Sequence, residues 1–465
     1  MSKMLSQSID RLRSNLGGLT WNPTHRVAKS SILSVLSQIQ IGTLLLVDES
    51  DQTNYMFGQK DIEATENTAM GARPRHRIKN VPPVKIVIKK AEFWMRLFLF
   101  ADMGFAEAYM LKDFECDDLT SFFLLFIMNR EQLNNGTTWF SQFSSVVSNL
   151  ARSTNTLSNA LLNVSAHYDI SNDMFAAFLS PDMTYSCPIW DCSQPDSDEA
   201  LESAQLRKLI YFIEGARIQP SDHVLEIGTG WGSFAIEAVK RTGCQVTTIT
   251  LSTEQKAMAD KRIEEAGLDD RIEVRLQDYR ELPVPMIPYD KIISIEMLEA
   301  VGQDYLTDYF DCVHRFLKPN GGIAMFQCIT MPEGRHEAYS KSKDFINQYI
   351  FPGGYLPSTT QILNHISRQS QGSLVIEKVE NIGGHYAKTL RLWRESFLGR
   401  FEKTIRPALL REHPNMTKEA IQVFRKKWEY YFSYCEAGFL TKTLGDVIIT
   451  VAREGSSELM DGIPL

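Results

Sequence analysis

The chain has 465 residues, which is enough for two or three domains and a large core. Its 43% hydrophobic and 23% charged residues are typical of a globular protein, and a net charge of −8 argues against general nucleic-acid binding. Seven scattered cysteines without a CxxC pair favour a reducing compartment over a disulfide framework. The N-terminus lacks a signal-peptide core and no apolar run is long enough to span a membrane, so we expect a cytoplasmic protein.

The N-terminal part of the chain is expected to form a small α+β domain over residues 31–130, preceded by a poorly ordered segment at 1–30. A basic stretch at Arg73–Lys79 is either a solvated loop or a contact for anionic head groups. Residues 131–165 are interpreted as a linker that carries a partly amphipathic helix. The expected elements are strands at 42–47 and 84–89 and helices at 91–100 and 119–128.

A strand, a glycine-rich turn and a helix follow one another at 224–239. Apolar residues around Glu226 predict a buried strand, and Gly228, Gly230 and Gly232 permit a turn that residues with a Cβ make poorly. Such a unit brings backbone N–H groups and a helix N-terminus to one spot, which can hold the polar part of a nucleotide-like cofactor. A tight turn in any α/β domain is the alternative for this stretch alone.

The strands that follow help to distinguish between classes of nucleotide-like cofactor. The strand at 245–250 lacks the acidic residue that a dinucleotide fold places there, and the turn lacks the Gly-Lys-Ser/Thr ending of a phosphate-binding loop. The strand at 272–276 ends in Gln277, Asp278 and Tyr279, where a carboxylate and a ring suit adenine. This pattern resembles an S-adenosylmethionine-dependent methyltransferase. The resemblance implies that the glycine turn and its strand carboxylate face the methionine part, and that Asp278 faces adenine.

Strands alternate with helices from about Leu206 onward, which predicts an α/β fold with a doubly wound, mostly parallel, seven-stranded sheet. The catalytic domain is expected at 166–455, followed by a tail at 456–465. An insertion at 332–356 is long for a compact domain and is interpreted as a lid. The seven expected strands lie near 224–227, 245–250, 272–276, 289–296, 322–329, 374–380 and 446–452.

Eight motifs, in order and at plausible spacing, are together similar to those of the cyclopropane fatty acid synthase family, also called the mycolic acid cyclopropane synthase family. The resemblance runs from His167 to Arg453, and the N-terminal domain resembles the extra domain of longer plant and fungal members. The motifs are HYDISND at 167–173, MTYSC at 183–187, LEIGTGWGS at 225–233, TLSTEQ at 250–255, QDY at 277–279, EMLEAVG at 296–302, FPGGYLPS at 351–358 and HYAKTLRLW at 385–393.

The resemblance implies transfer of the methyl group of S-adenosylmethionine to a cis double bond of an unsaturated phospholipid acyl chain. A carbocation forms, and loss of a proton closes a cyclopropane ring. An alkene is a poor nucleophile, so the site must orient it and exclude water, while the cation needs electrostatic stabilisation and a base. The substrate implies peripheral association with a membrane surface. No nucleic-acid partner is expected, and a homodimer stays open.

In the family that base is a bound bicarbonate. Carried over to this chain, its holders are the backbone of Cys187 together with Glu299, Ile329 and Tyr386. The chain departs from the bacterial members at Gln327, which stands where they have a His. Glutamine can donate a hydrogen bond to an anion but cannot carry a proton. We interpret Gln327 as a feature of the plant and fungal branch, which keeps anion binding and removes a His proton relay.

Cys435 matches a cysteine regarded as a nucleophile in the family, but a structural helix cysteine is favoured because the bicarbonate scheme needs no covalent step. His167 is expected to orient the Tyr185–Cys187 segment or to contact the site, and no metal is expected because no ligand cluster accompanies it. The residues implied to contact S-adenosylmethionine are Tyr185, Ser186, Glu226, Gly228, Gly230, Trp231, Gly232, Thr250, Leu251, Ser252, Gln255, Asp278 and Tyr279.

Three classes of function stay open at this point. The leading one is a lipid-modifying methyltransferase. The second is a methyltransferase of the same fold that methylates a lipid or a secondary metabolite without closing a ring. The third is a lipid-binding protein on an inactive core, against which the intact glycine turn, Glu299 and Tyr386 argue together.

Overall fold

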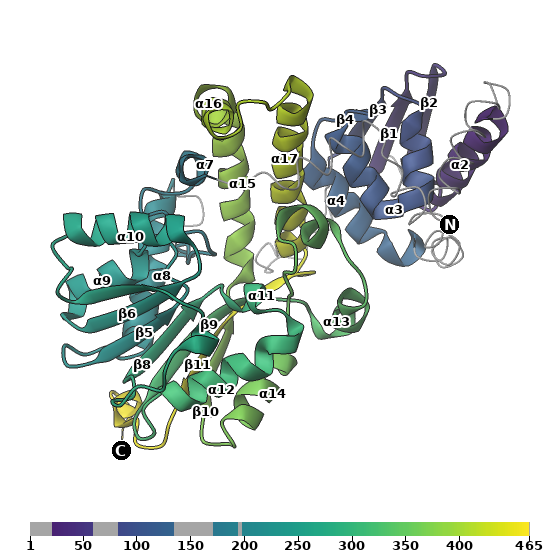
Figure 1. Cartoon of the computed structure of the whole chain (residues 1–465). Helices are drawn as coiled ribbons and strands as arrows, with labels where there is room; N and C mark the ends of the chain where they lie inside the picture. The colour runs from purple at the N-terminus through teal and green to yellow at the C-terminus, as the bar shows by residue number, and fades with distance from the viewer. Residues whose placement is uncertain (1–20, 59–81, 134–170, 194–197, 465) are drawn as a thin grey trace, which may run out of the picture. The chain divides into compact units, whose positions relative to one another are not determined.

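The computed structural model describes residues 21–58, 82–133, 171–193 and 198–464 (Figure 1). The chain forms two compact units, and each is described by itself. The first unit comprises Met1–Asp169 and His413–Ala437, and the second comprises Ile170–Glu412 and Gly438–Leu465. Among the described residues no helix is both long and apolar enough to cross a membrane.

The first unit is built on a four-stranded sheet in the order β2-β1-β3-β4. Strand β1 is antiparallel to β2 and parallel to β3, and alternate side chains of β1 are buried, as expected for a sheet with one covered face. The expected strands at 42–47 and 84–89 and the helix at 119–128 are confirmed, whereas β2 and β4 were not predicted. The elements are α2 (Trp21–Leu36), β1 (Thr43–Asp48), β2 (Thr53–Gly58), β3 (Val84–Ile88), α3 (Glu92–Met110), β4 (Phe114–Cys116) and α4 (Leu119–Met128).

Two expectations for the first unit need correction. Residues 21–30 were expected to be poorly ordered, but they lie in α2, where Lys29 pairs with Asp48 at 2.6 Å. The buried Asp48 also accepts a hydrogen bond from Trp94 at 2.8 Å, so α2, β1 and α3 share one polar contact in the core. The helix expected at 91–100 continues to Met110 across an interruption at Ala101, whose φ is +47°.

Most of α17 (Lys418–Leu440) belongs to the first unit, although the sequence placed it in the catalytic domain. The ring of Tyr430 packs edge-on against Phe123 at 5.0 Å, and Lys426 donates to the hydroxyl of Tyr109 at 2.8 Å. The sequence shows the aromatic residues of this helix but not their partners, which lie about three hundred positions earlier in the chain.

The second unit contains the predicted seven-stranded sheet, in the order β10-β11-β9-β8-β5-β6-β7. All neighbouring pairs are parallel except those of β11, which is antiparallel to both β9 and β10. The fold class is therefore confirmed, with each strand within about two residues of its expected position. The strands are β5 (His223–Ile227), β6 (Gln245–Thr250), β7 (Ile272–Leu276), β8 (Lys291–Ile295), β9 (Ile323–Thr330), β10 (Val375–Asn381) and β11 (Gly445–Ala452).

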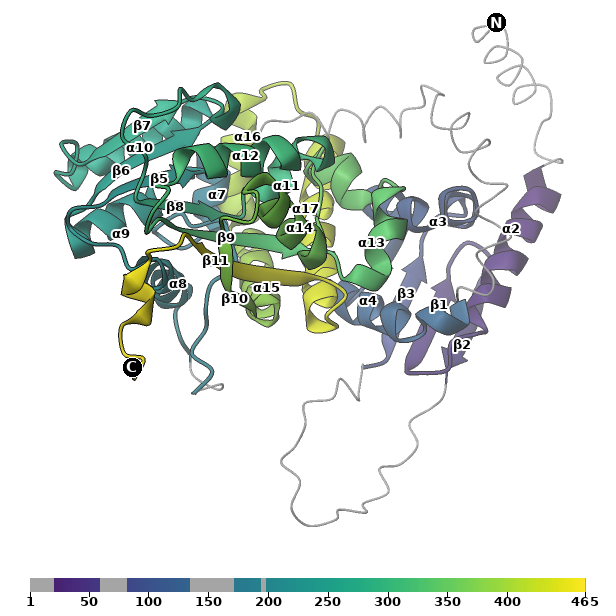
Figure 2. The ribbon, with the colours of Figure 1, turned by 90° about the horizontal axis from the view of Figure 1, so that it is seen from below.

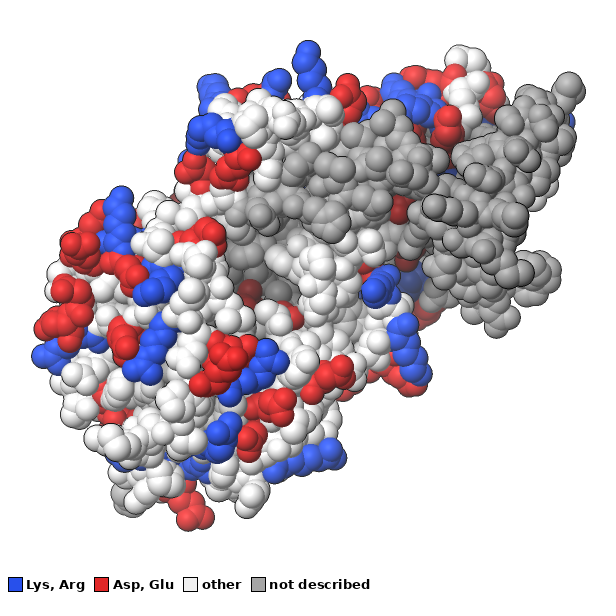
Figure 3. All heavy atoms as spheres, in the orientation of Figure 1, with Lys and Arg blue, Asp and Glu red and all other residues white. Residues whose placement is uncertain are grey.

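Helices flank both halves of this sheet. Helices α8, α9 and α10 lie beside β5, β6 and β7, whereas α12 and α14 lie beside the other half (Figures 1 and 2). The face of the second unit that Figure 3 shows carries interspersed acidic and basic side chains, the pattern of an ordinary solvated surface. The helices are α7 (Asn172–Phe178), α8 (Leu201–Gly215), α9 (Ser233–Thr242), α10 (Thr253–Glu265), α11 (Leu298–Val301), α12 (Leu306–Phe316), α13 (Glu333–Ser340), α14 (Thr359–Gln369), α15 (Gly383–Arg400) and α16 (Arg406–Glu412).

The order of the strands creates a position for a ligand. The chain leaves β5 for β6 and β7 on one side and returns to β8 on the other side of β5. At such a switch the loops after neighbouring strands diverge, which opens a crevice at the carboxyl ends of β5 and β8. The insertion expected as a lid contains α13 and a π-helical turn at Ile346–Ile350. Its end docks near this crevice, because the backbone N–H of Tyr355 donates to the carbonyl of Glu299 at 2.9 Å.

Candidate active site

The turn after β5 is shaped by glycines with positive φ. Gly228 has φ +102°, and a Cβ there would lie 3.2 Å from the side chain of Met297. Gly230 has φ +52°, and a Cβ there would meet no atom within 4 Å. The backbone N–H groups of Gly228 and Thr229 both donate to the carbonyl of Ile249 at 3.0 Å, which fixes the turn against β6. The turn therefore leaves open space beside a fixed backbone.

A cavity of about 380 Å³ lies at this place, at the carboxyl ends of β5, β6 and β8. Twelve of the thirteen residues expected to contact S-adenosylmethionine line it, and the exception, Gly232, is the N-cap of α9. Thr229 and Met297 also line the cavity, and both stand inside motifs that could have indicated them. Lys208 lines it too, from α8, and no motif indicated that residue.

At one end of this cavity lies Glu226, a buried carboxyl group with one oxygen atom left unpaired by the described residues. The side chain is 3% exposed, and its Oε2 atom has no hydrogen-bond partner among the described residues. Burial raises the pKa of Glu226 to about 8. An ammonium group beside this oxygen would satisfy it and favour the charged form. The residues present thus fit the amino group of the methionine part of S-adenosylmethionine.

At the other expected contact, Asp278 and Tyr279 already have partners in the protein. Asp278 forms an ion pair with Arg280 at 2.6 Å, and the hydrogen bonds from that side chain lower the pKa of Asp278. The buried ring of Tyr279 packs edge-on against Tyr309 at 5.2 Å. Both residues line the cavity, but a ligand there would meet a carboxylate that already carries a counter-ion.

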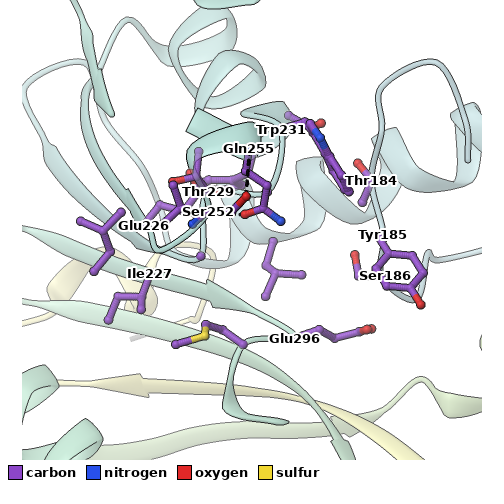
Figure 4. A pocket seen from close by; sticks show the side chains of 18 of the residues that line it. Thr184, Tyr185, Ser186, Glu226, Ile227, Thr229, Trp231, Ser252, Gln255 and Glu296 are labelled. Atoms are coloured by element: carbon purple, nitrogen blue, oxygen red, sulfur yellow. Dashed lines mark hydrogen bonds between the residues drawn. The ribbon is translucent and has the colours of Figure 1, made fainter. Parts of the chain in front are cut away.

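Across the cavity, Glu296 accepts three hydrogen bonds from separate parts of the chain. Its Oε1 accepts from the backbone N–H of Cys187 at 2.6 Å and from the amide of Gln327 at 2.7 Å. Its Oε2 accepts from the hydroxyl of Tyr386 at 2.9 Å. Figure 4 shows Glu296 in the same cavity as Glu226, with its carboxylate end toward Tyr185 and Ser186.

Two further carboxyl groups lie near Glu296. Glu299 accepts a hydrogen bond from the backbone N–H of Ile329, and its other oxygen has no partner among the described residues. Burial, reinforced by the charge of Glu296, raises the pKa of Glu299 to about 8. Asp446 accepts from the amide of Gln327 at 2.9 Å, and burial raises its pKa well above the usual range. Glu299 and Asp446 therefore keep their protons to a higher pH than ordinary carboxyl groups do.

The sequence assigned Cys187, Gln327, Tyr386, Glu299 and Ile329 to one anion, and the structure divides them into two groups. The first three donate to Glu296, and the backbone N–H of Ile329 donates to Glu299. Since these donors are engaged by side chains, the residues present do not fit a separate bicarbonate on the same hydrogen bonds. Sequence reasoning missed Glu296, although it opens the EMLEAVG motif.

The remaining expected residues are not part of this cluster. Burial raises the pKa of the Cys187 thiol, and the contact of Cys187 with Glu296 is made by its backbone N–H. Cys435 lies in the part of α17 that belongs to the first unit. His167 lies outside the described residues. Among the residues that the structure describes, no three His, Cys, Asp or Glu side chains are placed so that they could hold a metal ion together.

Comparisons with known proteins identify the family to which this chain is similar. Residues 155–448 match the family described as mycolic acid cyclopropane synthetase. The tuberculostearic acid methyltransferase UfaA1 of Mycobacterium tuberculosis is 36% identical over 356 residues, which cover 76% of this chain and 79% of that protein. The cyclopropane-fatty-acyl-phospholipid synthase of Escherichia coli (strain K12) is 32% identical over 372 residues, 79% of this chain and 87% of that protein. The crystal structure of mycolic acid cyclopropane synthase CmaA1 complexed with SAH and CTAB has a TM-score of 0.53 at 26% identity, covering 63% of this chain and 98% of that one.

Proposed function

Because the chain belongs to the mycolic acid cyclopropane synthetase family, we propose that it modifies the cis double bond of an unsaturated phospholipid acyl chain and closes a cyclopropane ring there. It is an S-adenosylmethionine-dependent methyltransferase that acts on lipid. The finer identity of the substrate follows the relative named cyclopropane-fatty-acyl-phospholipid synthase.

The observation that carries this proposal is that one cavity joins Glu226 to Glu296. When bound, S-adenosylmethionine supplies an electrophilic methyl group. Glu226 would hold its amino group at the glycine turn. At the opposite side Glu296 would place a carboxylate near the cation that forms on the acyl chain, where negative charge stabilises the transition state. The aromatic ring of Tyr185 also lines this cavity and can stabilise positive charge through its face.

A second product is favoured by one specific comparison. The relative named tuberculostearic acid methyltransferase is 36% identical to this chain, so methylation without ring closure is the alternative. Both products share the first step, in which the alkene takes the methyl carbon. They differ in which carbon then loses a proton. Loss from the new carbon closes the ring, and loss from the chain restores a double bond.

Mass spectrometry of lipids from cells that express the chain tests the proposal. We expect acyl chains that gain one CH2 group and no longer take up hydrogen under mild hydrogenation, as a cyclopropane requires. The same gain with hydrogen uptake retained would establish the alternative product. Lipids identical to those of control cells, with the protein folded and S-adenosylmethionine bound, would refute lipid modification.

The acyl chain lies within a bilayer, so we include peripheral docking on a membrane surface in the proposal. The Arg73–Lys79 stretch lies outside the described residues. Two lysines that follow this stretch in the sequence form ion pairs within the first unit. Lys89 pairs with Glu49 at 2.9 Å, and Lys90 pairs with Asp113 at 3.0 Å. We therefore assign head-group contact to the basic stretch together with the exposed Lys85. The homodimer left open by the sequence is tested by light scattering.

A further inference from the structure

Glu296 occupies the position at which the anion-binding donors of the site converge. The backbone N–H of Cys187, the amide of Gln327 and the hydroxyl of Tyr386 come from three distant parts of the second unit. All three donate to the two oxygens of one carboxylate, at 2.6 to 2.9 Å. Burial raises the pKa of Glu296, and the hydrogen bonds from Cys187 and Tyr386 oppose that shift. The three donors together fix the orientation of the carboxyl group.

The backbone conformation at Glu296 fixes the direction of its side chain. The residue directly follows β8 and has φ +48°, the left-handed region that residues with a Cβ rarely adopt. Its N–H donates to the carbonyl of Gln327 at 2.9 Å, which holds the residue in this conformation. A side chain that leaves an extended strand in this way turns out of the sheet. In this case it carries a carboxylate to the wall of the cofactor cavity.

The surrounding charges leave little room for a second anion. Asp446 accepts a hydrogen bond from the same Gln327 amide at 2.9 Å. The negative charge of Glu296 also contributes to the raised pKa of Glu299. The positive charge of the buried Lys208 lowers the pKa of Glu296 and so partly offsets the effect of burial. It donates to the hydroxyl of Ser186 at 2.5 Å. A free bicarbonate on the same donors would have to displace a carboxylate that the backbone holds in place.

We infer that Glu296 is the catalytic base of this enzyme, in place of bound bicarbonate, and that it also stabilises the cation on the acyl chain. This inference rests on the proposed function. The π electrons of the alkene form the bond to the methyl carbon, and the carbon–sulfur electron pair leaves with sulfur. A Glu296 oxygen then takes a proton from the added carbon, and the released C–H pair closes the third ring bond. The carboxyl group later returns the proton to water.

Two substitutions at Glu296 test this assignment. Glu296→Gly removes the carboxylate, relieves the positive φ and frees the three donors, whereas Glu296→Gln keeps the shape and removes the charge. In buffer stripped of CO2 we expect the wild type to keep its turnover within about twofold. Both variants should lose at least about a hundredfold, as for loss of a positioned base. Added bicarbonate or formate should restore Glu296→Gly by at least about tenfold, but not Glu296→Gln, whose amide fills the space.

A binding measurement separates this inference from the proposed function. Carbon-13 NMR of labelled bicarbonate should show exchange broadening with Glu296→Gly and none with the wild type. Gln371→Gly is the matched control, because Gln371 is exposed and has φ +54°, so it relieves the backbone without touching the site. Thermal unfolding and S-adenosylmethionine affinity confirm that each variant is folded.

The outcomes divide cleanly. Wild-type turnover that vanishes without bicarbonate and returns with it would overturn the inference, and so would bicarbonate binding to the wild type or full turnover in Glu296→Gly. Loss of turnover in both variants, with a wild type that needs no bicarbonate, supports it even without rescue. If the wild type forms no lipid product under any condition, the proposed function fails, and the NMR comparison still decides which group occupies the donors.

Discussion

Glu226 offers a direct measurement of how the cavity binds its cofactor. The carboxyl group is buried, one of its oxygens has no partner among the described residues, and its pKa is raised to about 8. The free protein should therefore hold a proton on Glu226 at pH 7. Binding of an ammonium group beside it favours the carboxylate. S-adenosylmethionine should then expel the proton, and Glu226→Gln should abolish this release while it preserves the shape of the side chain.

The size of the effect follows from the pKa. A group with a pKa of about 8 carries ~0.9 proton at pH 7, so nearly one proton should leave per bound S-adenosylmethionine. Ionising the group at pH 7 costs about 1.4 kcal/mol, which the wild type recovers from the ion pair. Glu226→Gln has neither the cost of ionisation nor the ion pair with the ammonium group. We expect a net loss of roughly 1 to 3 kcal/mol, about five- to 150-fold in affinity.

Isothermal titration calorimetry in buffers of different ionisation enthalpy measures both quantities. The slope of the observed enthalpy against the buffer enthalpy gives the number of protons released. Glu264→Gln, an exposed substitution on α10 in the same unit, should leave the slope and the affinity unchanged. A wild-type release near zero at pH 7, or equal release in Glu226→Gln, would refute the account of Glu226 given by its burial.

The same burial makes a statement about stability. The folded state holds the proton of Glu226 more tightly than the unfolded chain, whose pKa is near 4.5. Stability should therefore fall as pH rises through the interval between these two values. From pH 5 to pH 7 the loss amounts to roughly 2 to 3 kcal/mol for this group alone. Glu226→Gln should lack that part of the pH dependence.

Three further outcomes test other parts of the site. Gly230→Val places a side chain in the open space of the turn at φ +52°, and calorimetry should show S-adenosylmethionine affinity at least about tenfold lower while the protein still unfolds cooperatively. Glu299→Gln should lower turnover at least about a hundredfold without changing cofactor affinity. If turnover requires an ionised Glu299, wild-type turnover should rise as the pH passes about 8, and Glu299→Gln should show no such rise. Substitution of Arg73, Arg75, Arg77 and Lys79 by Glu should weaken binding to anionic vesicles by about two to three decades, at about 1 kcal/mol per basic residue. Raised salt should weaken binding in the same way. Unchanged sedimentation with vesicles would count against docking by this stretch.

Local patterns predicted much of this protein because they need no knowledge of distant contacts. Apolar runs between turn residues gave the strands of the large sheet, and the glycines after β5 gave the turn, since positive φ is a local requirement. The packing of α17 on the first unit was not predictable in that way. Tyr430 contacts Phe123 although residues Ile170–Glu412, the larger part of the second unit, lie between them in the sequence.

Glu296 was missed for the same reason. Its partners Cys187, Gln327 and Tyr386 lie 109, 31 and 90 positions away, and only the order of the sheet brings them together. A sequence pattern shows that Glu296 stands in a motif, but it does not show that the backbone there turns to φ +48° and directs the carboxylate to those donors. The family motif drew attention to Glu299 instead, whose hydrogen bond to Ile329 is one contact of the same region.

Gln327 connects these observations. A glutamine amide has two N–H donors, and this one lies 2.7 Å from Glu296 and 2.9 Å from Asp446. Both hydrogens are therefore committed to carboxyl groups of the chain, and none is left for an external anion. A neutral donor between two acids with raised pKa values also favours a state in which the acids share a proton, because like charges so close together resist ionisation. Gln327 then serves to bridge the two carboxyl groups, a task that requires no proton transfer by the glutamine itself.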